Sequence, residues 1–394
     1  MKGSIKLKHK KVLAALLGTT IVVMCDFTPA TAIFAEQIGS TKDTATTAIA
    51  DGIAVNDVNF PDDNFRRYVS SNCDTNSDSV LSSYEIESVT GINISLMEID
   101  NLKGIEYFTE LNYLNCSWNS LTSLDVSKNT RLIYLSCAGN QLTELDVTQN
   151  TELTELYCNN NQLTSLDVTK NTVLETLYCY ENQLTSLDVT KSTALTTLSC
   201  ENNQLTELDV SKNTKLVILD CDSNQLTALD IKKNTELSYF DCNYNQLTVP
   251  ISIDKTFDLS TLPSGFDVTK ASNWTNATVN GNILTVKDLS LGSVTYTYND
   301  GNSKFNDSTF ELKVVIVGDV NNNGTVDAID ASIVLSAYAA QATTGKTGLT
   351  LIEEKAADVN SNGVVDAVDA STILSYYAYI STGGTASLNE FINM

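Results

Sequence analysis

The sequence predicts a multidomain chain built around a β-solenoid, with smaller modules on either side of it. Between residues 111 and 250 the pattern L-x-x-L-x-C-x-x-N-x-L-x-x-L-D-V returns every 21 residues, in seven copies. One coil of this length cannot bury its own leucines, so similar coils must stack to form a continuous core. A helical pattern with an acidic loop precedes the block, whereas alternating β patterns and a duplicated acidic loop follow it. We therefore expect a helical N-terminal cap, the solenoid, a small all-β module and an all-α C-terminal module.

Each coil is expected to begin with a short parallel strand over the letters L-x-x-L-x-C. Side chains alternate between the two faces of a strand, so a leucine and the cysteine of each coil point inward and stack in columns. An asparagine three positions after the cysteine can satisfy backbone groups at the bend and bond the neighbouring coil. The stacking suits buried thiols better than disulfide geometry, and a metal ladder is the alternative. The cysteines are Cys116, Cys137, Cys158, Cys179, Cys200, Cys221 and Cys242, and the asparagines are Asn119, Asn140, Asn161, Asn182, Asn203, Asn224 and Asn245.

The repeat block resembles the bacterial leucine-rich repeat family, with cysteine at a position where that family often accepts small residues. Its outward strand positions should form a concave strip that is rich in tyrosine in the first four coils and acidic in the last three, without lysine or arginine. Such a strip fits recognition of neutral sugar chains or of a complementary protein, although strands favour tyrosine in any case. The tyrosines are Tyr113, Tyr134, Tyr157, Tyr178 and Tyr180, and the acidic residues are Glu201, Asp220, Asp222 and Asp241.

Residues 56–110 are expected to form an EF-hand-like helical cap and a first, incomplete repeat. The segment DTNSDSVLSSYE has oxygen ligands at the positions that bind calcium in an EF-hand loop. Ser79 stands where the sharp turn of such a loop normally has glycine. Calcium binding and a plain helical cap therefore both stay open. The candidate ligands are Asp74, Asn76, Asp78, Val80 through its carbonyl, Ser82 and Glu85.

Residues 317–381 carry two copies of a similar loop, DVNNNGTVDAID and DVNSNGVVDAVD, each followed by a helical pattern. Oxygen ligands occur at loop positions 1, 3, 5, 7, 9 and 12, and glycine occurs at the turn in position 6. Aspartate in place of glutamate at position 12, together with the following helix, makes this segment resemble the type I dockerin. The loop residues are Asp319, Asn321, Asn323, Thr325, Asp327 and Asp330, then Asp358, Asn360, Asn362, Val364, Asp366 and Asp369.

The resemblance to type I dockerins implies one calcium ion in each of the two loops and docking to a cohesin module of a scaffoldin in a cellulosome. An offset of 39 residues relates the two halves, so each half presents nearly the same patch. We therefore expect two alternative binding modes, related by a half-turn of the module. The expected docking residues are Ala328, Ile329, Leu335 and Tyr338, with Ala367, Val368, Leu374 and Tyr377 in the second half. The class of cohesin stays open.

The remaining segments have simpler interpretations. Residues 1–35 have a lysine-rich start, an apolar run and small residues near their end, which indicates a secretory signal peptide. Residues 36–55 read as a polar linker and residues 382–394 as a tail. Residues 251–316 alternate apolar and polar positions and predict the small β module, for which the sequence suggests no function.

Composition excludes several classes of function. The formal net charge is −24, so a nucleic acid would be repelled. The single histidine, His9, lies in the signal peptide, so the mature chain lacks Ser-His-Asp, Cys-His and histidine-zinc chemistry. Nothing in the pattern places the carboxylate pair of a glycoside hydrolase, and no segment after the signal peptide is apolar enough to span a membrane. We expect no enzymatic activity from the chain itself.

Together these features predict a secreted, noncatalytic cellulosome component attached to a cell-surface multi-enzyme complex, with a role in polysaccharide catabolism. Its dockerin would bind a scaffoldin cohesin, and its repeats would bind a polysaccharide or a protein. Two alternatives are a glycoside-hydrolase-associated enzyme subunit and an adhesin or inhibitor whose repeats bind protein.

Overall fold

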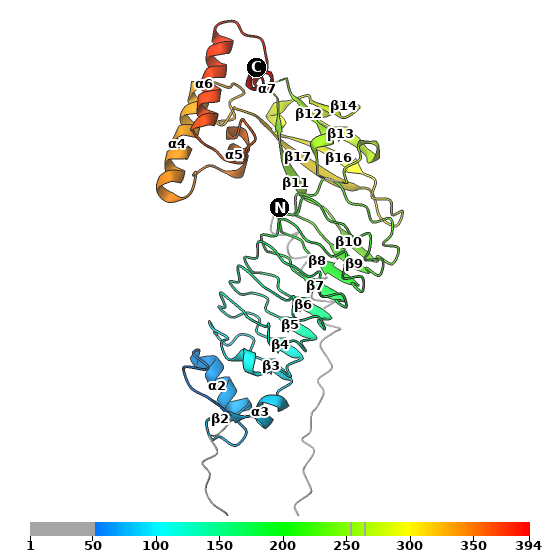
Figure 1. Cartoon of the computed structure of the whole chain (residues 1–394). Helices are drawn as coiled ribbons and strands as arrows, with labels where there is room; N and C mark the ends of the chain where they lie inside the picture. The colour runs from blue at the N-terminus through cyan, green and yellow to red at the C-terminus, as the bar shows by residue number, and fades with distance from the viewer. Residues whose placement is uncertain (1–51, 253, 264) are drawn as a thin grey trace, which may run out of the picture. The chain divides into compact units, whose positions relative to one another are not determined.

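The computed structural model describes residues 52–394 except 253 and 264, so the predicted signal peptide and most of the predicted linker lie outside the described residues. The described residues belong to one compact unit, 51–394. A helical cap, a stack of parallel strands, a β module and a helical module follow one another along it (Figure 1). The predicted solenoid architecture with C-terminal helices is confirmed. No helix within the described residues combines the length and apolarity that crossing a membrane requires.

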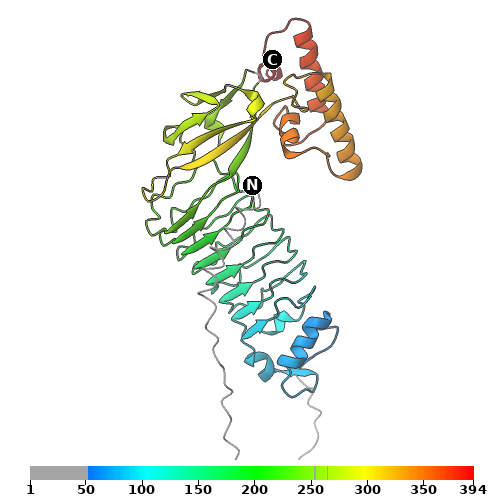
Figure 2. The ribbon, with the colours of Figure 1, turned by 180° about the vertical axis from the view of Figure 1, so that it is seen from behind.

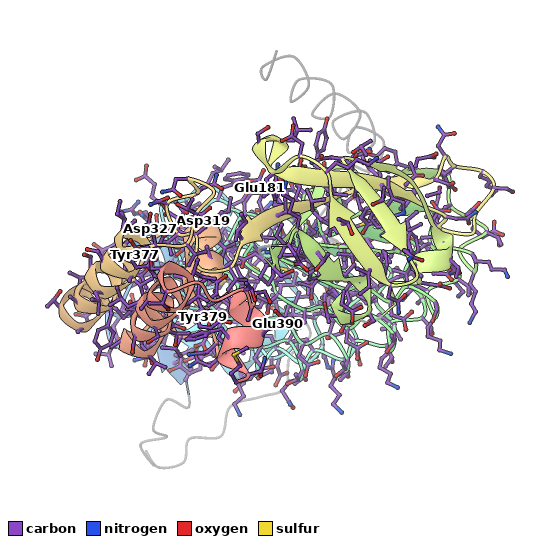
Figure 3. All side chains as sticks on the ribbon, turned by 90° about the horizontal axis from the view of Figure 1, so that it is seen from above. Glu181, Asp319, Asp327, Tyr377, Tyr379 and Glu390 are labelled. Carbon is purple, nitrogen blue, oxygen red and sulfur yellow. The ribbon has the colours of Figure 1, made fainter. Side chains whose placement is uncertain are left out.

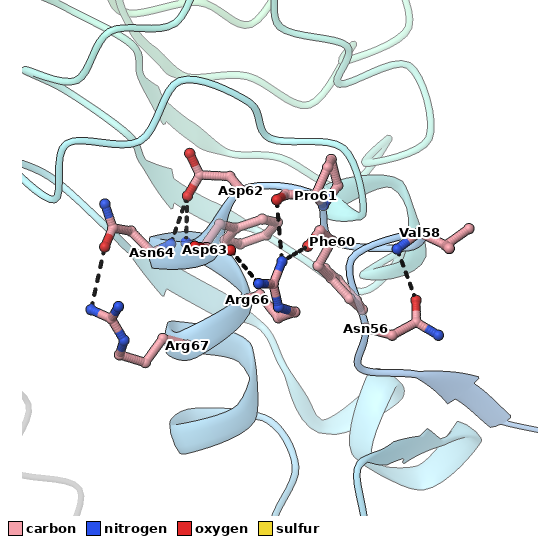
Figure 4. A network of polar contacts seen from close by, with 10 residues as sticks. Asn56, Val58, Phe60, Pro61, Asp62, Asp63, Asn64, Arg66 and Arg67 are labelled. Atoms are coloured by element: carbon pink, nitrogen blue, oxygen red, sulfur yellow. Dashed lines mark hydrogen bonds and ion pairs between the residues drawn. The ribbon is translucent and has the colours of Figure 1, made fainter.

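The N-terminal cap consists of β1 (Gly52–Ala54), α2 (Asp63–Asn72), β2 (Val80–Ser82) and α3 (Ser83–Ser88). Asp62 caps α2 because its carboxylate accepts hydrogen bonds from the backbone N–H groups of Asn64 and Phe65 (Figure 4). Its other oxygen accepts from the N–H of Asp100, 2.9 Å away, which ties the cap to the incomplete first coil. Arg66 donates to the carbonyl oxygen of Phe60 across the same turn (Figure 4).

The solenoid sheet contains eight parallel strands in the order in which they occur in the chain. Each strand pairs with the strand of the next coil. The inward-pointing leucine at the centre of each strand of the repeat is fully buried, as the period predicts. In the last coil this position is occupied by Phe240, which is half-buried. The views of Figures 1 and 2 agree on this stacking. The strands are β3 (Gly91–Asn93), β4 (Tyr113–Asn115), β5 (Tyr134–Ser136), β6 (Glu155–Tyr157), β7 (Thr176–Tyr178), β8 (Thr197–Ser199), β9 (Ile218–Asp220) and β10 (Tyr239–Asp241). A 3-10 turn, η1 (Ile105–Tyr107), precedes β4.

The cysteine and asparagine columns adopt the predicted arrangement. All seven cysteines of the coils are buried and free, so they act as stacked thiols. Burial raises the pKa of Cys137 to about 12, which keeps its thiol protonated. The side-chain amide of Asn140 donates to the carbonyl oxygens of Cys137 and Cys116, 2.9 and 3.1 Å away, and its oxygen accepts from the N–H of Leu121. Each such asparagine therefore satisfies its own bend and the preceding coil.

A second asparagine ladder runs along the other side of the coils and was not predicted. Asn150 donates to the carbonyl oxygens of Val126 and Asn129 in the preceding coil, at 3.0 and 2.9 Å. The same pair of bonds recurs in other coils, and Ser192 replaces asparagine in one of them. The asparagines of this ladder, all fully buried, are Asn129, Asn150, Asn171, Asn213 and Asn234.

The β module closes the C-terminal end of the solenoid core. The hydroxyl of buried Tyr296 donates to the carbonyl oxygen of Thr227, 2.7 Å away, and the N–H of Ile231 donates to the carbonyl of Asp300. Trp274 stacks on Tyr296 at 4.4 Å and is half-buried, so it belongs to this core. One sheet has the order β11 (Asn245–Ile251), β17 (Ser308–Ile316), β16 (Ser293–Tyr298) and β13 (Ala271–Thr275), and the other has β12 (Thr256–Asp258), β15 (Ile283–Val286) and β14 (Ala277–Asn280). Three 3-10 turns connect them: η2 (Leu259–Thr261), η3 (Val268–Lys270) and η4 (Leu289–Leu291).

The C-terminal module contains α4 (Ala328–Thr344), α5 (Leu351–Ala357), α6 (Ala367–Ser381) and α7 (Leu388–Ile392). The expected tail thus includes a helix. Phe391 of α7 packs against the rings of Tyr376 and Tyr379, and Leu388 is buried. The hydroxyl of Tyr379 also accepts the N–H groups of residues 385 and 386, so the chain end is fastened to α6.

Candidate functional site

The first loop of the C-terminal module turns its side-chain oxygens toward its own backbone. The carboxylate of Asp319 accepts the N–H groups of Asn323 and Gly324 at 2.9 and 2.8 Å. The carboxylate of Asp330 accepts the N–H groups of Val320, Asn321 and Asp327. Gly324 has φ 89°, a left-handed conformation that only glycine adopts freely. Positions 1 and 12 of the loop are therefore fixed at opposite ends of one turn.

The second loop repeats this hydrogen-bond pattern. Asp358 accepts the N–H groups of Asn362 and Gly363, and Gly363 has φ 83°. Asp369 accepts the N–H of Val359 at 3.1 Å and that of Asp366 at 2.9 Å. The two loops therefore have the same local structure, as their 39-residue offset predicts.

The donor set of these loops fits calcium. Carboxylate, amide and backbone oxygens are the ligands that this ion takes, and no nitrogen or sulfur ligand is required. Burial raises the pKa of both Asp319 and Asp369, so a bound cation would offset the cost of ionising them. In the part of the chain that the structure describes, no group of three or more histidine, cysteine, aspartate or glutamate side chains is placed to hold a metal ion, and the oxygen set of these loops includes amide and backbone oxygens as well as carboxylates. The ligand assignments themselves stay predictions.

The N-terminal loop has the same pattern of hydrogen bonds. Asp74 accepts the N–H groups of Asp78 and Ser79, as the first aspartate of each C-terminal loop does. Glu85 accepts the N–H groups of residues 75, 76 and 82, which are the counterparts of those that Asp330 accepts. The N–H of Ser82 is the largest of the hydrogen-bonding causes that lower the pKa of Glu85 to about 2. The carboxylate is thus ionised at any ordinary pH.

Besides glutamate at position 12, the turn position distinguishes the N-terminal loop from the other two. Ser79 adopts φ 64° at the position where both C-terminal loops have glycine. A side chain in this conformation costs on the order of 1 kcal/mol. The predicted strain is therefore present, and the loop nevertheless keeps the shape of the glycine-containing loops. Asn76 and Asp78 each accept a backbone N–H two residues on, which helps to hold it.

The predicted docking residues lie on the exposed sides of α4 and α6. Ile329 is 59% exposed and Val368 is 57% exposed, although the two residues that follow each of them are buried. Leu335 and Leu374 are also exposed to nearly the same extent, as are Tyr338 and Tyr377, and both Ala328 and Ala367 are exposed. Figure 3 labels Asp327 of the first loop and Tyr377 of α6 on the helical module. The two halves thus present matched apolar patches, whereas contact with a cohesin stays a prediction.

The tyrosine strip, Tyr113 to Tyr180, is a continuous row of contacting rings, in which two stacked pairs are joined by a tilted contact and Tyr180 meets Tyr178 edge-on. Tyr113 and Tyr134 stack with centroids 4.5 Å apart and planes at 15°, and Tyr157 and Tyr178 stack at 5.2 Å and 11°. Tyr134 and Tyr157 join the two pairs at 5.3 Å. All five rings are half-buried, and burial raises the pKa of Tyr134 and of Tyr180 to about 12, so these hydroxyls stay protonated.

The acidic end of the same sheet face concentrates carboxylates. Asp220 is only 8% exposed, and Tyr239 donates its hydroxyl to it at 3.3 Å. Burial, reinforced by the charges of Glu201 and Asp222, raises the pKa of Asp220 to about 8. Burial likewise raises the pKa of Glu201 to about 7, although Ser199 donates to it at 2.5 Å. This end of the face therefore holds partly desolvated acids beside one another.

One exposed aromatic residue near the sheet was missed in the sequence. Trp118 is 55% exposed and adopts φ 56°, and a Cβ at residue 139 would lie 2.5 Å from its indole. Only glycine at position 139 lets the indole lie across the next coil. The sequence feature that could have revealed this contact is Gly139 itself, because other coils have Asn, Glu, Ser or Tyr at the same left-handed position.

Family comparisons identify two of the modules. Residues 317–376 match the dockerin type I domain, and residues 130–171 and 172–213 match leucine-rich repeats. The chain thus carries leucine-rich repeats and a C-terminal type I dockerin domain. Type I dockerin domains bind calcium and dock onto cohesins in extracellular cellulosomes, and leucine-rich repeats commonly provide protein-binding surfaces.

Individual relatives match the repeats. Internalin J of Listeria monocytogenes is 37% identical over 97 residues, which are 24% of this chain and 10% of the length of that relative. The solved functional domain of the same Listeria protein, described as including a cysteine ladder, is 21% identical and is matched over 100% of its length and 68% of this chain, with a TM-score of 0.36. Internalin C2 of Listeria monocytogenes is 21% identical over 90% of its length and 52% of this chain, with a TM-score of 0.45. At these TM-scores the structural similarity supports no functional conclusion.

Proposed function

We propose that this chain is a secreted, noncatalytic component of a cellulosome, which it joins by docking its dockerin domain onto a scaffoldin cohesin. The observation that carries the proposal is the duplicated loop and helix with matched exposed residues. Ile329 with Leu335 in α4, and Val368 with Leu374 in α6, are large apolar side chains left uncovered beside loops suited to calcium. Apolar residues exposed in such a group indicate an interface.

Calcium would have a structural role in the dockerin domain, because it would stabilise the starts of α4 and α6. Asp319, Asp330 and the other loop oxygens would hold one ion at the start of α4, and Asp358 with Asp369 would hold a second at the start of α6. The ion neutralises carboxylates that the fold brings together, so it stabilises the two helix starts. Since Asp330 and Asp369 are also the capping-box residues of α4 and α6, the same side chains position the docking helices.

We also propose a third calcium ion in the N-terminal loop. The support is that Asp74 and Glu85 accept backbone N–H groups from the same loop positions as the first and last aspartates of the dockerin loops. The strain at Ser79 should make this site weaker than the other two. Isothermal titration of the full chain should then resolve three sites, of which Glu85→Gln removes the weakest. A stoichiometry of two that Glu85→Gln leaves unchanged would contradict this assignment.

The leucine-rich repeats would form the recognition surface of this component and would bind a polysaccharide or a protein. Through this binding the chain would take part in polysaccharide breakdown by the complex. The tyrosine strip and the acidic residues beside it are the supporting features. An adhesin or inhibitor that binds a protein through the same face is the second candidate, because leucine-rich repeats commonly bind protein. A glycoside-hydrolase-associated enzyme subunit is the remaining alternative.

Calorimetric titration of the secreted full chain with a panel of type I cohesins tests the proposal directly. We expect binding in calcium and none after chelation. Failure of every cohesin to bind the calcium-loaded, folded chain would overturn the docking role.

Incubation with plant polysaccharides, followed by a reducing-sugar assay, tests the noncatalytic role, and sugar release by the purified chain would contradict it. Recovery of the chain from the culture medium with its N-terminal segment removed would support secretion.

A further inference from the structure

The stacking of the tyrosine strip limits what the strip can bind. A sugar ring packs its C–H groups against the open face of an aromatic ring. Between Tyr113 and Tyr134, and between Tyr157 and Tyr178, those faces are covered by the neighbouring tyrosine, with interplanar angles of 15° and 11°. The strip therefore offers mainly ring edges and hydroxyl groups. Rigid tyrosines of this kind provide contact area and hydrogen bonds at low entropic cost, as they do in protein interfaces.

The acidic end of the face adds a requirement for charge. Asp220 pairs with Asp241 across β9 and β10, and Glu201 and Asp222 occupy the outward positions after β8 and β9. Neighbouring coils are about 4.8 Å apart, so these carboxylates lie close enough to repel one another. No lysine or arginine occupies an outward strand position in the seven coils. The sheet face therefore presents mainly negative charge at this end.

We propose that the outward face of the solenoid sheet docks a protein that presents lysine or arginine side chains to Glu201, Asp220, Asp222 and Asp241 while its apolar and hydrogen-bonding groups cover the tyrosine strip. This inference rests on the proposed role of the repeats as a recognition surface and specifies its partner. Charge complementarity sets the orientation, because basic groups over coils five to seven leave the uncharged part of the partner over the rings. The strands from β4 to β10 extend over about 30 Å, which accommodates an interface of standard size.

The test uses the calcium-loaded full chain and a synthetic probe. The probe is an immobilised peptide of arginine, leucine and serine, compared with a counterpart in which citrulline replaces each arginine, since citrulline keeps the shape and removes the charge. Cellohexaose and xylohexaose are the sugar probes. All binding is measured at pH 9, above the pKa values of about 7 for Glu201 and about 8 for Asp220, where the variant Glu201→Gln/Asp222→Asn removes two charges from the sheet face. Asp167→Asn/Asp188→Asn removes two charges from the exposed aspartate column elsewhere on the coils and is the matched control.

At about 0.15 M salt, which screens long-range attraction, we expect the arginine peptide to bind and the citrulline peptide to bind at least about tenfold more weakly. The sheet-face variant should lose about tenfold in affinity for the arginine peptide, whereas the control variant should lose less than about threefold. Equal losses in the two variants would show attraction to net charge alone and overturn the proposal. Binding of either hexasaccharide that Tyr157→Ala abolishes would overturn it in favour of a glycan. Cohesin binding is measured in parallel and tests the dockerin alone. If the chain fails to bind cohesin but still binds the arginine peptide through the sheet face, the docking role is refuted and the proposal for the sheet face stands.

Discussion

The solenoid and the dockerin domain both arise from internal repetition, but they use it for different purposes. The 21-residue repeat produces one continuous core, in which each leucine and cysteine depends on the coils on either side. The 39-residue repeat produces two nearly equivalent halves, each with its own loop and its own exposed patch. Repetition therefore supplies stability in the first region and redundancy in the second. Perturbations should separate the two regions accordingly.

Removal of calcium should have the largest effect, and it should act on the calcium loops and their helices while leaving the solenoid unchanged. Chelation leaves the carboxylates of both loops without their counter-ion, so α4 and α6 should lose their fixed arrangement and cohesin binding should disappear. The leucine ladder requires no ion, so its amides should keep their protection. Hydrogen exchange followed by mass spectrometry, with and without chelator, measures both regions in one sample. Equal loss of protection in residues 111–250 would contradict the separation.

Charge introduced into the docking patches should reveal their redundancy. Ile329→Asp alone should weaken cohesin binding by about threefold or less, because the mode that uses Val368 survives. Val368→Asp alone should behave in the same way, and the double variant should abolish binding because either mode would then bury an unpaired charge. Calorimetry against one cohesin gives all three affinities, and Tyr84→Asp, on the exposed surface of the cap, is the control. Complete loss in one single variant would show a single fixed mode.

Truncation of a core leucine should show that the coils depend on one another. Leu156 is fully buried between two neighbouring coils, so Leu156→Ala should destabilise the solenoid by about 2–5 kcal/mol. Val173→Ala, at a residue that is 44% exposed in the following coil, should cost less than about 0.5 kcal/mol. Urea unfolding followed by circular dichroism compares the two variants. Similar midpoints would mean that the column of leucines does not determine the stability of the stack.

The acidic end of the sheet face should make stability depend on pH. In the folded chain the pKa values of Glu201 and Asp220 are about 7 and about 8, above their ordinary values of 4.5 and 3.8. A group whose pKa is higher in the folded state than in the unfolded state binds more protons in the folded state. Its contribution to the free energy of unfolding is therefore complete below pH 4 and is lost as the pH rises through 7 to 8. Between pH 6 and 9, at constant calcium, the melting temperature should fall by on the order of 5 °C. Asp220→Asn should flatten this slope, and an unchanged slope would exclude Asp220 as its source.

Much of this architecture could be predicted from the sequence because its determinants are periodic. Leu156 and Cys158 are buried in the places that the period assigns, and Asp319 and Asp330 occupy the loop ends that ligand spacing assigns. Other features depend on neighbours that no local pattern reveals. The stacking of Tyr113 on Tyr134 depends on side-chain rotamers, and the pKa of Asp220 depends on acids one coil away. The packing of Phe391 on Tyr376 could not be anticipated because short terminal segments carry too weak a helical signal.

The smallest expected effect concerns the one interruption of the second asparagine ladder. Asn171 and Asn213 each donate both amide protons to two carbonyl oxygens of the preceding coil. Ser192 has one proton, and its hydroxyl lies 3.4 Å from the carbonyl of Val168 and 3.1 Å from that of Asn171. Restoring asparagine would therefore give each of these two carbonyls its own donor, a gain of about 1 kcal/mol.

An opposing cost makes Ser192→Asn informative. The side-chain oxygens of the ladder asparagines are buried and accept no hydrogen bond among the described residues. Desolvation of one more such oxygen costs on the order of 1 kcal/mol, yet five coils already tolerate it in the same environment. We expect a net stabilisation of about 0.5 kcal/mol in urea unfolding, and a loss in the reverse control Asn171→Ser. A lower stability of Ser192→Asn would show that the buried oxygen outweighs the second hydrogen bond, and that serine at this coil is the better solution.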